Sequence, residues 1–139
     1  MVEDNGRALV GSPLVYEAGR YRMDFANLEK KVREFKVKLI LLCSPHNPVG
    51  RVWTREELIR VEEIALRYGA VVISDEIHSD FVWDEHRHHV LASLKPEFEE
   101  NTVICTSPSK TFNLAGLQCS NIFRPNQKHS LMKIFPGSG

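Results

Sequence analysis

The chain has 139 residues, enough for one domain of ordinary size with a buried core. Hydrophobic residues make up 42% of it and charged residues 26%, which are values of a globular protein and not of a disordered one. The 18 basic and 18 acidic residues balance, so the charge predicts no binding to nucleic acid or to a membrane surface.

The three cysteines are widely spaced and form neither a zinc-binding pattern nor a disulfide framework. We expect a protein of the reducing cytoplasm. No apolar run approaches the roughly 20 residues that a transmembrane helix needs, so no membrane association is expected either.

The N-terminal part combines an irregular stretch with a helix. Glycines and a proline are scattered over residues 1–21, which predicts loops with at most one short strand. Asp24 is a candidate N-cap, and Leu28, Val32 and Phe35 then recur at helical spacing. We expect these three apolar residues to pack into the core.

The next helix has the best-defined local signature of the sequence. Thr54 and Glu57 match a capping box, and Trp53 can pack on Leu58 as a hydrophobic staple. Gly69 suits the C′ position, where a helix commonly ends. A helix from Thr54 to Gly69 is therefore predicted.

Continuous apolar runs lie on both sides of this helix. Residues 39–43 and 70–73 are typical of strands that are buried on both faces, and strand, helix and strand together predict a parallel βαβ unit. Further strands are predicted over residues 102–106 and 119–123. The fold class is therefore α/β, an open and mostly parallel sheet with flanking helices.

Polar residues of several chemical types follow three of these strands. In open α/β sheets, ligands bind beyond the carboxyl ends of the strands. An amide, a carboxylate, an imidazole, two hydroxyls and an amine are thus expected at one edge. The residues are Asn47, Asp75, His78, Ser107, Ser109 and Lys110.

This set of groups suits pyridoxal 5′-phosphate (PLP). A lysine amine forms a Schiff base with a carbonyl, and PLP is a carbonyl cofactor whose ring nitrogen pairs with an acidic residue. Lys110 is the candidate amine and Asp75 the candidate acid. The neighbouring hydroxyls could hold the phosphate, and the amide and imidazole could hydrogen-bond the phenolic oxygen of the ring.

Three separated motifs also resemble a known family. Residues 44–51 (SPHNPVGR), 75–78 (DEIH) and 107–118 (SPSKTFNLAGLQ) resemble the fold-type I aminotransferase superfamily of class I/II. The closest branch is that of the cystathionine β-lyase-like C–S lyases. The resemblance extends from about Asn5 to about Asn126.

The resemblance implies a role for each candidate residue. Lys110 would be the catalytic lysine, which holds PLP and moves the α-proton of the substrate, and Asp75 would pair with the pyridine nitrogen. Asn47 and His78 would contact the phenolic oxygen; transaminases of the superfamily usually have a tyrosine where His78 stands.

Ser107 and Ser109 would help to hold the phosphate. Many relatives have a phosphate-binding arginine eight residues after the lysine, where this chain has Gln118. That departure favours the lyase branch over the transaminase branch.

The implied reaction is α,β-elimination on cysteine thioethers, a class of small amino-acid substrates, to give thiol, pyruvate and ammonia. An aminotransferase is the second interpretation. Family members are much longer and form homodimers, so residues 1–126 are expected to be part of the PLP-binding large domain. Residues 127–139 are expected to be a divergent or artificial tail. A third interpretation is therefore an inactive fragment that serves in assembly or regulation.

Structural interpretations compete with each assignment. Lys110 could be a surface lysine, Asp75 a turn cap, Asn47 part of a turn and His78 a structural histidine, while the two serines could only shape their turn. The histidine-rich residues 85–89 are interpreted as a solvated loop and not as a metal site. A dinucleotide-binding domain is disfavoured because no Gly-x-Gly-x-x-Gly follows a strand.

Overall fold

The computed structural model describes residues 2–125, so the tail expected over 127–139 lies outside the described residues. In chain order the helices and strands are β1 (Leu14–Glu17), β2 (Arg20–Met23), α1 (Phe25–Glu34), β3 (Leu39–Cys43), α2 (Arg55–Tyr68), β4 (Val71–Asp75), β5 (Thr102–Thr106) and β6 (Asn121–Phe123). Short 3-10 helices are η1 (Glu3–Asn5), η2 (Leu91–Ser93), η3 (Pro96–Glu100) and η4 (Ala115–Leu117).

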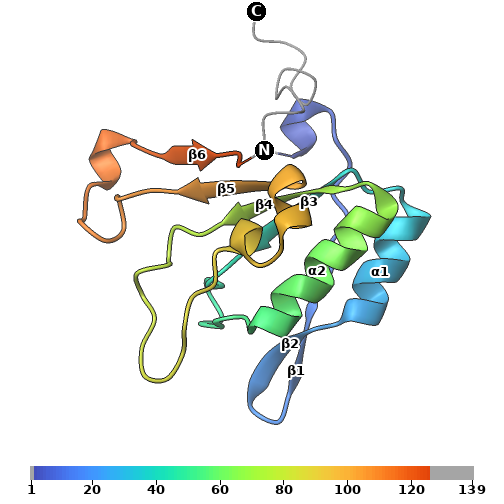
Figure 1. Ribbon diagram of the computed structural model, residues 1–139, viewed down its shortest axis with the longest axis horizontal. Helices are drawn as coiled ribbons and strands as arrows, with labels where there is room; N and C mark the ends of the chain where they lie inside the picture. Colours follow the sequence, from blue (N-terminus) through green and yellow to red (C-terminus); the bar gives the residue numbers. More distant parts are fainter. Residues whose placement is uncertain (1, 126–139) are drawn as a thin grey trace, which may run out of the picture.

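A four-stranded sheet of order β3-β4-β5-β6 organises the fold. The first three strands are parallel, and β6 runs antiparallel to β5. In Figure 1 the arrowheads of β3, β4 and β5 all point toward the left, where the loops that follow them emerge. The predicted α/β class with a mostly parallel sheet is confirmed.

One face of this sheet carries the core. The crossovers through α2 and through η2 and η3 lie on the same face, because right-handed connections between successive parallel strands return on the same side. Ile40, Val72 and Ile104 point into this core and are buried, whereas Leu41 on the other face is 53% exposed. The prediction that both faces are buried is therefore wrong for β3, whereas Val71 and Ile73 on the same face of β4 are half-buried.

The N-terminal stretch forms a hairpin where mainly loops were predicted. Strands β1 and β2 pair antiparallel and are joined by Ala18 and Gly19, both with positive φ (49° and 76°). A two-residue turn of this kind matches the twist of a hairpin, but its usual signature is Asn, Asp or Gly at the first position. Because Ala18 occupies that position, the sequence does not predict the hairpin.

The two helices differ in how well they follow their patterns. The capping box of α2 is present, Gly69 ends the helix with φ 65°, and Trp53 and Leu58 are both fully buried. Helix α1 ends at Glu34, so Phe35 becomes its C-cap and is 62% exposed. The predicted packing of Phe35 into the core is wrong, because the helical spacing on which it rests stops one residue earlier. Within residues 2–125, no helix combines the length and the apolar character needed to cross a membrane.

Candidate active site

The carboxyl ends of three parallel strands meet at one edge of the sheet. The register aligns Cys43, Asp75 and Cys105 in a single row across β3, β4 and β5. Backbone hydrogen bonds continue the ladder one step further, from Ser44 N to the Asp75 carbonyl (2.9 Å) and from Glu76 N to the Cys105 carbonyl (2.8 Å). The three loops with the predicted site residues therefore start side by side.

Lys110 lies in a compact turn directly after β5. The turn is closed by backbone hydrogen bonds from Phe112 N to the Pro108 carbonyl (3.0 Å) and from Leu114 N to the Ser109 carbonyl (2.9 Å). The Lys110 side chain is exposed, and no hydrogen bond or ion pair joins its amine to another residue within 2–125. A backbone held in place thus presents an amine that is available to a ligand.

A side-chain hydrogen bond joins the lysine turn to the loop that follows Asp75. The Thr111 hydroxyl donates to Oδ2 of Asp80 at 2.6 Å. Asp75 is itself exposed, and its Oδ1 accepts a hydrogen bond from Ile77 N at 3.1 Å. The predicted amine and the predicted acid therefore belong to adjacent loops that are bonded to each other.

The charge of Asp75 reaches the thiols on both neighbouring strands. Burial raises the pKa of the Cys105 thiol, and the negative charge of Asp75 raises it further. Burial also raises the pKa of the Cys43 thiol. A hydrogen bond from the Asn47 backbone lowers this pKa, and the negative charge of Asp75 raises it. A carboxylate thus lies at the centre of the edge, between two thiols.

The loop that carries Asn47 is anchored on both sides of the exposed Asn47 side chain. Arg51 forms two hydrogen bonds to the Glu57 carboxylate, at 2.7 and 2.9 Å, and both side chains are largely buried. The indole N–H of Trp53 donates to the Cys43 carbonyl at 2.9 Å, which ties the end of the loop back to β3. Asn47 therefore lies at the edge in a loop with two side-chain anchors.

The two serines bond to each other and to their own turn. The Ser107 hydroxyl donates to the Cys119 carbonyl at 2.6 Å, lies 2.8 Å from the Ser109 hydroxyl and accepts from Ser109 N at 3.0 Å. Because a hydroxyl has one proton, the donor of Ser107 is already in use. The turn-shaping interpretation thus has direct support, and the predicted binding of phosphate by Ser107 and Ser109 stays a prediction.

His78 lies in the loop after β4, two residues before Asp80. Its half-buried ring packs edge-on against Phe81, with the ring centroids 6.0 Å apart. The imidazole is thus partly fixed by an aromatic contact and still partly open to solvent. Both interpretations of this histidine, structural and cofactor-binding, stay open.

Sequence reasoning missed a buried carboxylate next to Asp75. Glu76 is 2% exposed and is bonded to Ser74, His88 and Leu91. The available signal was position: Glu76 falls two residues after Ser74 and so continues the core-facing side of the strand. A charged residue at such a position needs partners, and a search for them would have drawn attention to this one.

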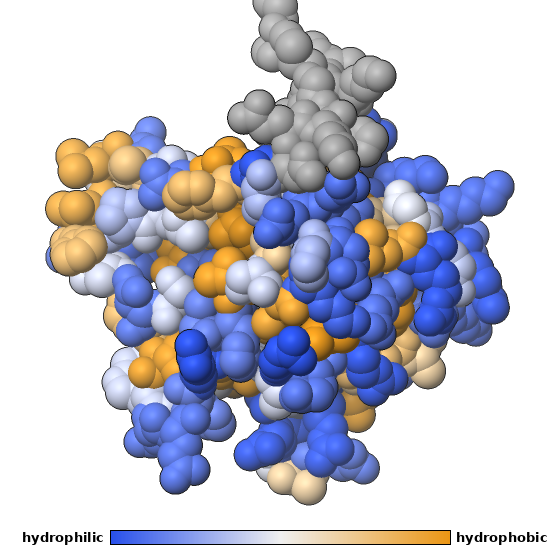
Figure 2. Space-filling view, viewed as in Figure 1, coloured by the Kyte–Doolittle hydropathy of each residue, from blue (hydrophilic) through white to orange (hydrophobic). Residues whose placement is uncertain are grey.

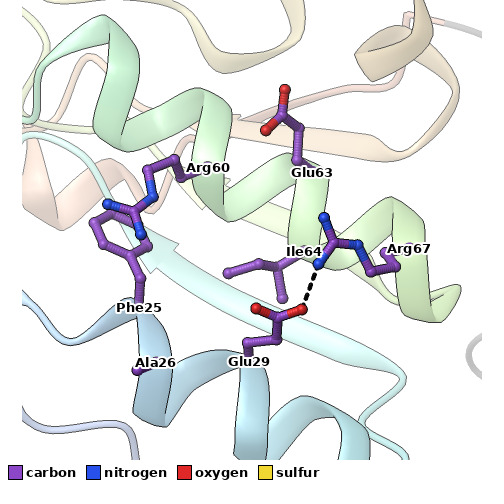
Figure 3. A pocket seen from close by; sticks show the side chains of 7 residues that line it. All are labelled: Phe25, Ala26, Glu29, Arg60, Glu63, Ile64 and Arg67. Carbon is purple, nitrogen blue, oxygen red and sulfur yellow. Dashed lines mark hydrogen bonds and ion pairs between the residues drawn. The ribbon is translucent and has the colours of Figure 1, made fainter.

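A groove of about 300 Å3 lies away from this edge, between α1 and α2. Figure 3 shows Arg60 over the ring of Phe25 and Arg67 turned toward Glu29, with which it forms an ion pair. Its charges are thus paired or stacked on neighbouring side chains. None of the predicted site residues lines the groove, and the described residues contain no group of three or more potential metal ligands.

Apolar side chains gather on the surface beyond the lysine turn. Phe112, Leu117 and Ile122 are all more than 60% exposed. Figure 2 shows this region at the upper left as a concentration of orange over η4 and β6. Exposed apolar groups of this size commonly mark contact surfaces.

Comparison with known proteins gives consistent relatives. The sequence model of the family "Aminotransferase class I and II" matches residues 2–130. Cystathionine beta-lyase PatB of Bacillus subtilis is 48% identical over 127 residues, which are 91% of this chain and 33% of that protein.

Two solved structures resemble the fold closely. Cystalysin from Treponema denticola, which contains a pyridoxal 5′-phosphate cofactor, has a TM-score of 0.86 at 39% identity; the match covers 91% of this chain and 32% of the cystalysin chain. The PLP-bound C–S lyase from Staphylococcus hominis has a TM-score of 0.86 at 38% identity, and the match covers 95% of this chain and 33% of the lyase chain. The chain thus spans about one third of the length of these relatives.

Proposed function

The chain belongs to the class I and II aminotransferase family, and from that premise we propose that its protein is a PLP-dependent C–S lyase. The reaction is α,β-elimination on cysteine thioethers, which yields a thiol, pyruvate and ammonia. Lys110 is its catalytic residue. Because the relatives are about three times as long, the activity belongs to the whole protein, of which this chain contributes the lysine-bearing part.

The observation that carries the proposal is the connection between the lysine turn and the loop after Asp75. Asp75 aligns with Cys105, the last but one residue of β5, and Thr111 beside Lys110 bonds to Asp80. This arrangement supports an amine and a carboxylate acting on one ligand.

The donor set of the edge fits PLP. The cofactor requires an amine for covalent attachment, an acid for its ring nitrogen and polar groups for its phenolic oxygen and phosphate. The edge offers each of these from a different loop, and the Lys110 amine has no partner among residues 2–125. When bound, PLP supplies a ring that accepts electrons from a substrate carbanion.

Each residue of the edge then has defined work. Lys110 would hold the cofactor, and its amine, once the amine of the substrate has displaced it, would remove the proton from the α-carbon of the substrate. Asp75 accepts a hydrogen bond from the protonated ring nitrogen and balances its charge. Asn47 and His78 donate hydrogen bonds to the phenolic oxygen. The hydroxyl of Ser109, which is hydrogen-bonded to that of Ser107, contributes to the phosphate site.

Trapping of the covalent linkage tests the attachment site. PLP is added to the protein, the linkage is reduced with borohydride, and peptides are analysed by mass spectrometry. We expect the pyridoxyl mass on Lys110 and none in Lys110→Arg, which keeps the positive charge but is a far weaker nucleophile. Lys95, which pairs with Glu63 at 2.7 Å, serves as the internal control lysine. An adduct on another lysine in the unmodified protein would remove the assignment.

A second assay separates the lyase from an aminotransferase. The family is named for aminotransferases, whereas PatB, at 48% identity, is a cystathionine beta-lyase. We expect release of pyruvate and thiol from a cysteine thioether, with little transfer of the amino group to a keto acid. The reverse ratio would favour the aminotransferase. Linkage of PLP to Lys110 with neither product would favour the inactive, assembly-related interpretation.

The setting of the enzyme is part of the same proposal. Residues 1–126 form part of the PLP-binding large domain, and the substrates are small amino acids. The exposed apolar residues Phe112, Leu117 and Ile122 support a homodimer, which sedimentation of the whole protein would test. The free thiols of Cys43, Cys105 and Cys119 support a cytoplasmic location.

A further inference from the structure

We infer that Glu76 and His88 are positioning residues that hold Asp75 and the lysine turn in place. The inference rests on the proposed function, because it concerns how the same edge is kept in order. Neither residue is among those expected to touch the cofactor. Their contribution acts through the loop of residues 76–90, which joins β4 to η2.

The Glu76 carboxylate clamps both ends of this loop. Its Oε1 accepts hydrogen bonds from the Ser74 hydroxyl (3.0 Å), at the end of β4, and from Leu91 N (3.1 Å), the first residue of η2. Its Oε2 lies 2.8 Å from Nε2 of His88, which is 12% exposed. One buried side chain thus joins strand, loop and 3-10 helix.

The clamp lies next to the groups that face the ligand. Glu76 follows Asp75 directly, and strand alternation turns the two carboxylates toward opposite faces of the sheet. Among residues 2–125, the hydrogen-bond partner of the Asp75 carboxylate is the N–H of Ile77, which belongs to the turn that begins at Glu76. A movement of Glu76 therefore changes the direction in which Asp75 points.

The clamp also reaches the lysine turn. The loop that it fixes carries Asp80, whose carboxylate accepts the hydrogen bond from Thr111 next to Lys110. It carries His78 as well, which with Asn47 is a candidate for binding the phenolic oxygen. Release of the loop would therefore loosen the expected cofactor contacts of Asp75, Lys110 and His78 together.

The desolvation cost of the buried Glu76 carboxylate favours one fixed arrangement of its hydrogen bonds. A buried carboxylate that loses its partners retains a large desolvation cost, so the arrangement that satisfies all its partners is strongly preferred. The neutral amide of glutamine has nearly the same shape but only one accepting oxygen. That oxygen can still accept from Ser74 and Leu91 N, while the amide NH2 takes the place of Oε2 opposite Nε2 of His88. Glu76→Gln thus removes the buried charge and the acceptor that faces His88, with little change in volume.

A second buried carboxylate supplies a matched control. Glu62 is completely buried and accepts hydrogen bonds from Thr102 (2.5 Å) and Asn101 (3.2 Å), at the amino end of β5 and thus at the opposite end of the sheet. Glu62→Gln makes the same chemical change in a similar environment, away from the proposed site. Any effect of Glu76→Gln that Glu62→Gln lacks reports on the site and not on folding.

The experiment compares both variants with the unmodified PLP-loaded protein. Three measurements are made: a titration for the affinity for PLP, a pH titration of the absorbance of bound PLP, and steady-state kinetics that give kcat and KM for the thioether. For Glu76→Gln we expect kcat to fall by at least about tenfold, with a much smaller change in KM, because small misplacements of reacting groups slow the reaction more than binding. Glu62→Gln should leave the ratio of kcat to KM unchanged.

The absorbance titration gives a readout that is independent of turnover. A misdirected Asp75 stabilises the protonated ring nitrogen less, so less positive charge opposes protonation of the nitrogen that joins the ring to Lys110. The pH midpoint of the absorbance change should therefore rise, by roughly one unit, in Glu76→Gln and not in Glu62→Gln. Equal midpoints in all three proteins would overturn the inference.

A milder variant covers the case in which Glu76→Gln does not fold. His88→Asn removes the partner of Oε2 and leaves the bonds from Ser74 and Leu91 in place. It should raise the midpoint in the same direction by a smaller amount, and an unchanged midpoint would overturn the inference. If the unmodified protein itself carries no PLP on Lys110, the proposed function fails first and the inference fails with it.

Discussion

The βαβ unit β3–α2–β4 and the segment 107–123 after β5 have opposite character. The first is closed: Trp53, Leu58 and Val72 are fully buried in one hydrophobic core, and helix α2 is capped at both ends. The second is open, with exposed apolar side chains and an amine that has no partner within residues 2–125. Stability is thus concentrated in one region and the proposed chemistry in the other.

Substitutions in the closed unit and in the open segment should therefore have different effects. In the closed unit a change removes packing that the chain itself supplies, so it should appear as a loss of stability. In the open segment the side chains have few packing partners among the described residues, so a change should appear mainly in ligand binding. Measurements of stability and of ligand binding should therefore distinguish substitutions in the two regions.

A pair of leucine truncations tests the division directly. Leu58 is completely buried in the core, whereas Leu117 is 70% exposed on η4. Leu58→Ala should lower the free energy of unfolding by about 3 kcal/mol, through lost burial and a residual cavity. Leu117→Ala should change that of this chain by itself by less than about 0.5 kcal/mol, because the chain does not bury the side chain. Urea unfolding of both variants provides the measurement, and equal losses would show that the open segment is as well packed as the closed unit.

The same division explains what the sequence could predict. The βαβ unit was predictable because its signals are local: the capping box, the glycine at the helix end and the apolar runs all agree. The hairpin β1–β2 was not, because Ala18 occupies a turn position that usually signals itself with another residue. The exposure of Leu41 was hidden too, since an apolar run does not reveal on which side a crossover passes.

Prediction of the site had a similar limit. The edge residues could be named because strands that end in parallel bring their loops together, and the register of Asp75 with Cys105 bears this out. Glu76 had a local signal in its core-facing position, but its partners His88 and Leu91, which lie 12 and 15 positions away, could not be predicted. Such contacts depend on the path of a long loop, which local patterns do not encode.

Removal of the N-terminal cap of α2 tests how much a local hydrogen bond stabilises the closed unit. The Thr54 hydroxyl accepts from Glu57 N at 3.2 Å, and the Glu57 carboxylate accepts from Thr54 N at 2.8 Å. Thr54→Ala should cost about 1 kcal/mol of unfolding free energy. Because Glu57 also holds Arg51 and the Asn47 loop, affinity for PLP should be measured together with stability. Thr54→Ser, which retains the hydroxyl, is the control and should lose much less.

The buried Glu62 predicts a pH-dependent change within the closed region. Burial raises the pKa of its carboxyl above the ordinary value, against hydrogen bonds from Thr102 and Asn101. The folded state therefore binds this proton more tightly than the unfolded state. The resulting stabilisation is fully present below the unfolded pKa and is lost as the pH rises through the folded pKa. Urea unfolding of the unmodified protein and of Glu62→Gln at several pH values should show a difference that shifts in favour of the unmodified protein as the pH falls. A difference that does not change with pH would contradict the raised pKa.

The smallest expected effect tests whether Asp75 is charged at the open edge. Its carboxylate raises the pKa of the Cys105 thiol, in addition to the effect of burial. Asp75→Asn should lower that pKa, expose more thiolate at a given pH and so speed alkylation of Cys105 by about two- to threefold. Cys119 is exposed and serves as the internal reference in the same sample. Iodoacetamide labelling with quantitative mass spectrometry gives the ratio of the two rates. An unchanged ratio would mean that no negative charge lies beside Cys105, and Asp75 would then lack the property that its proposed role requires.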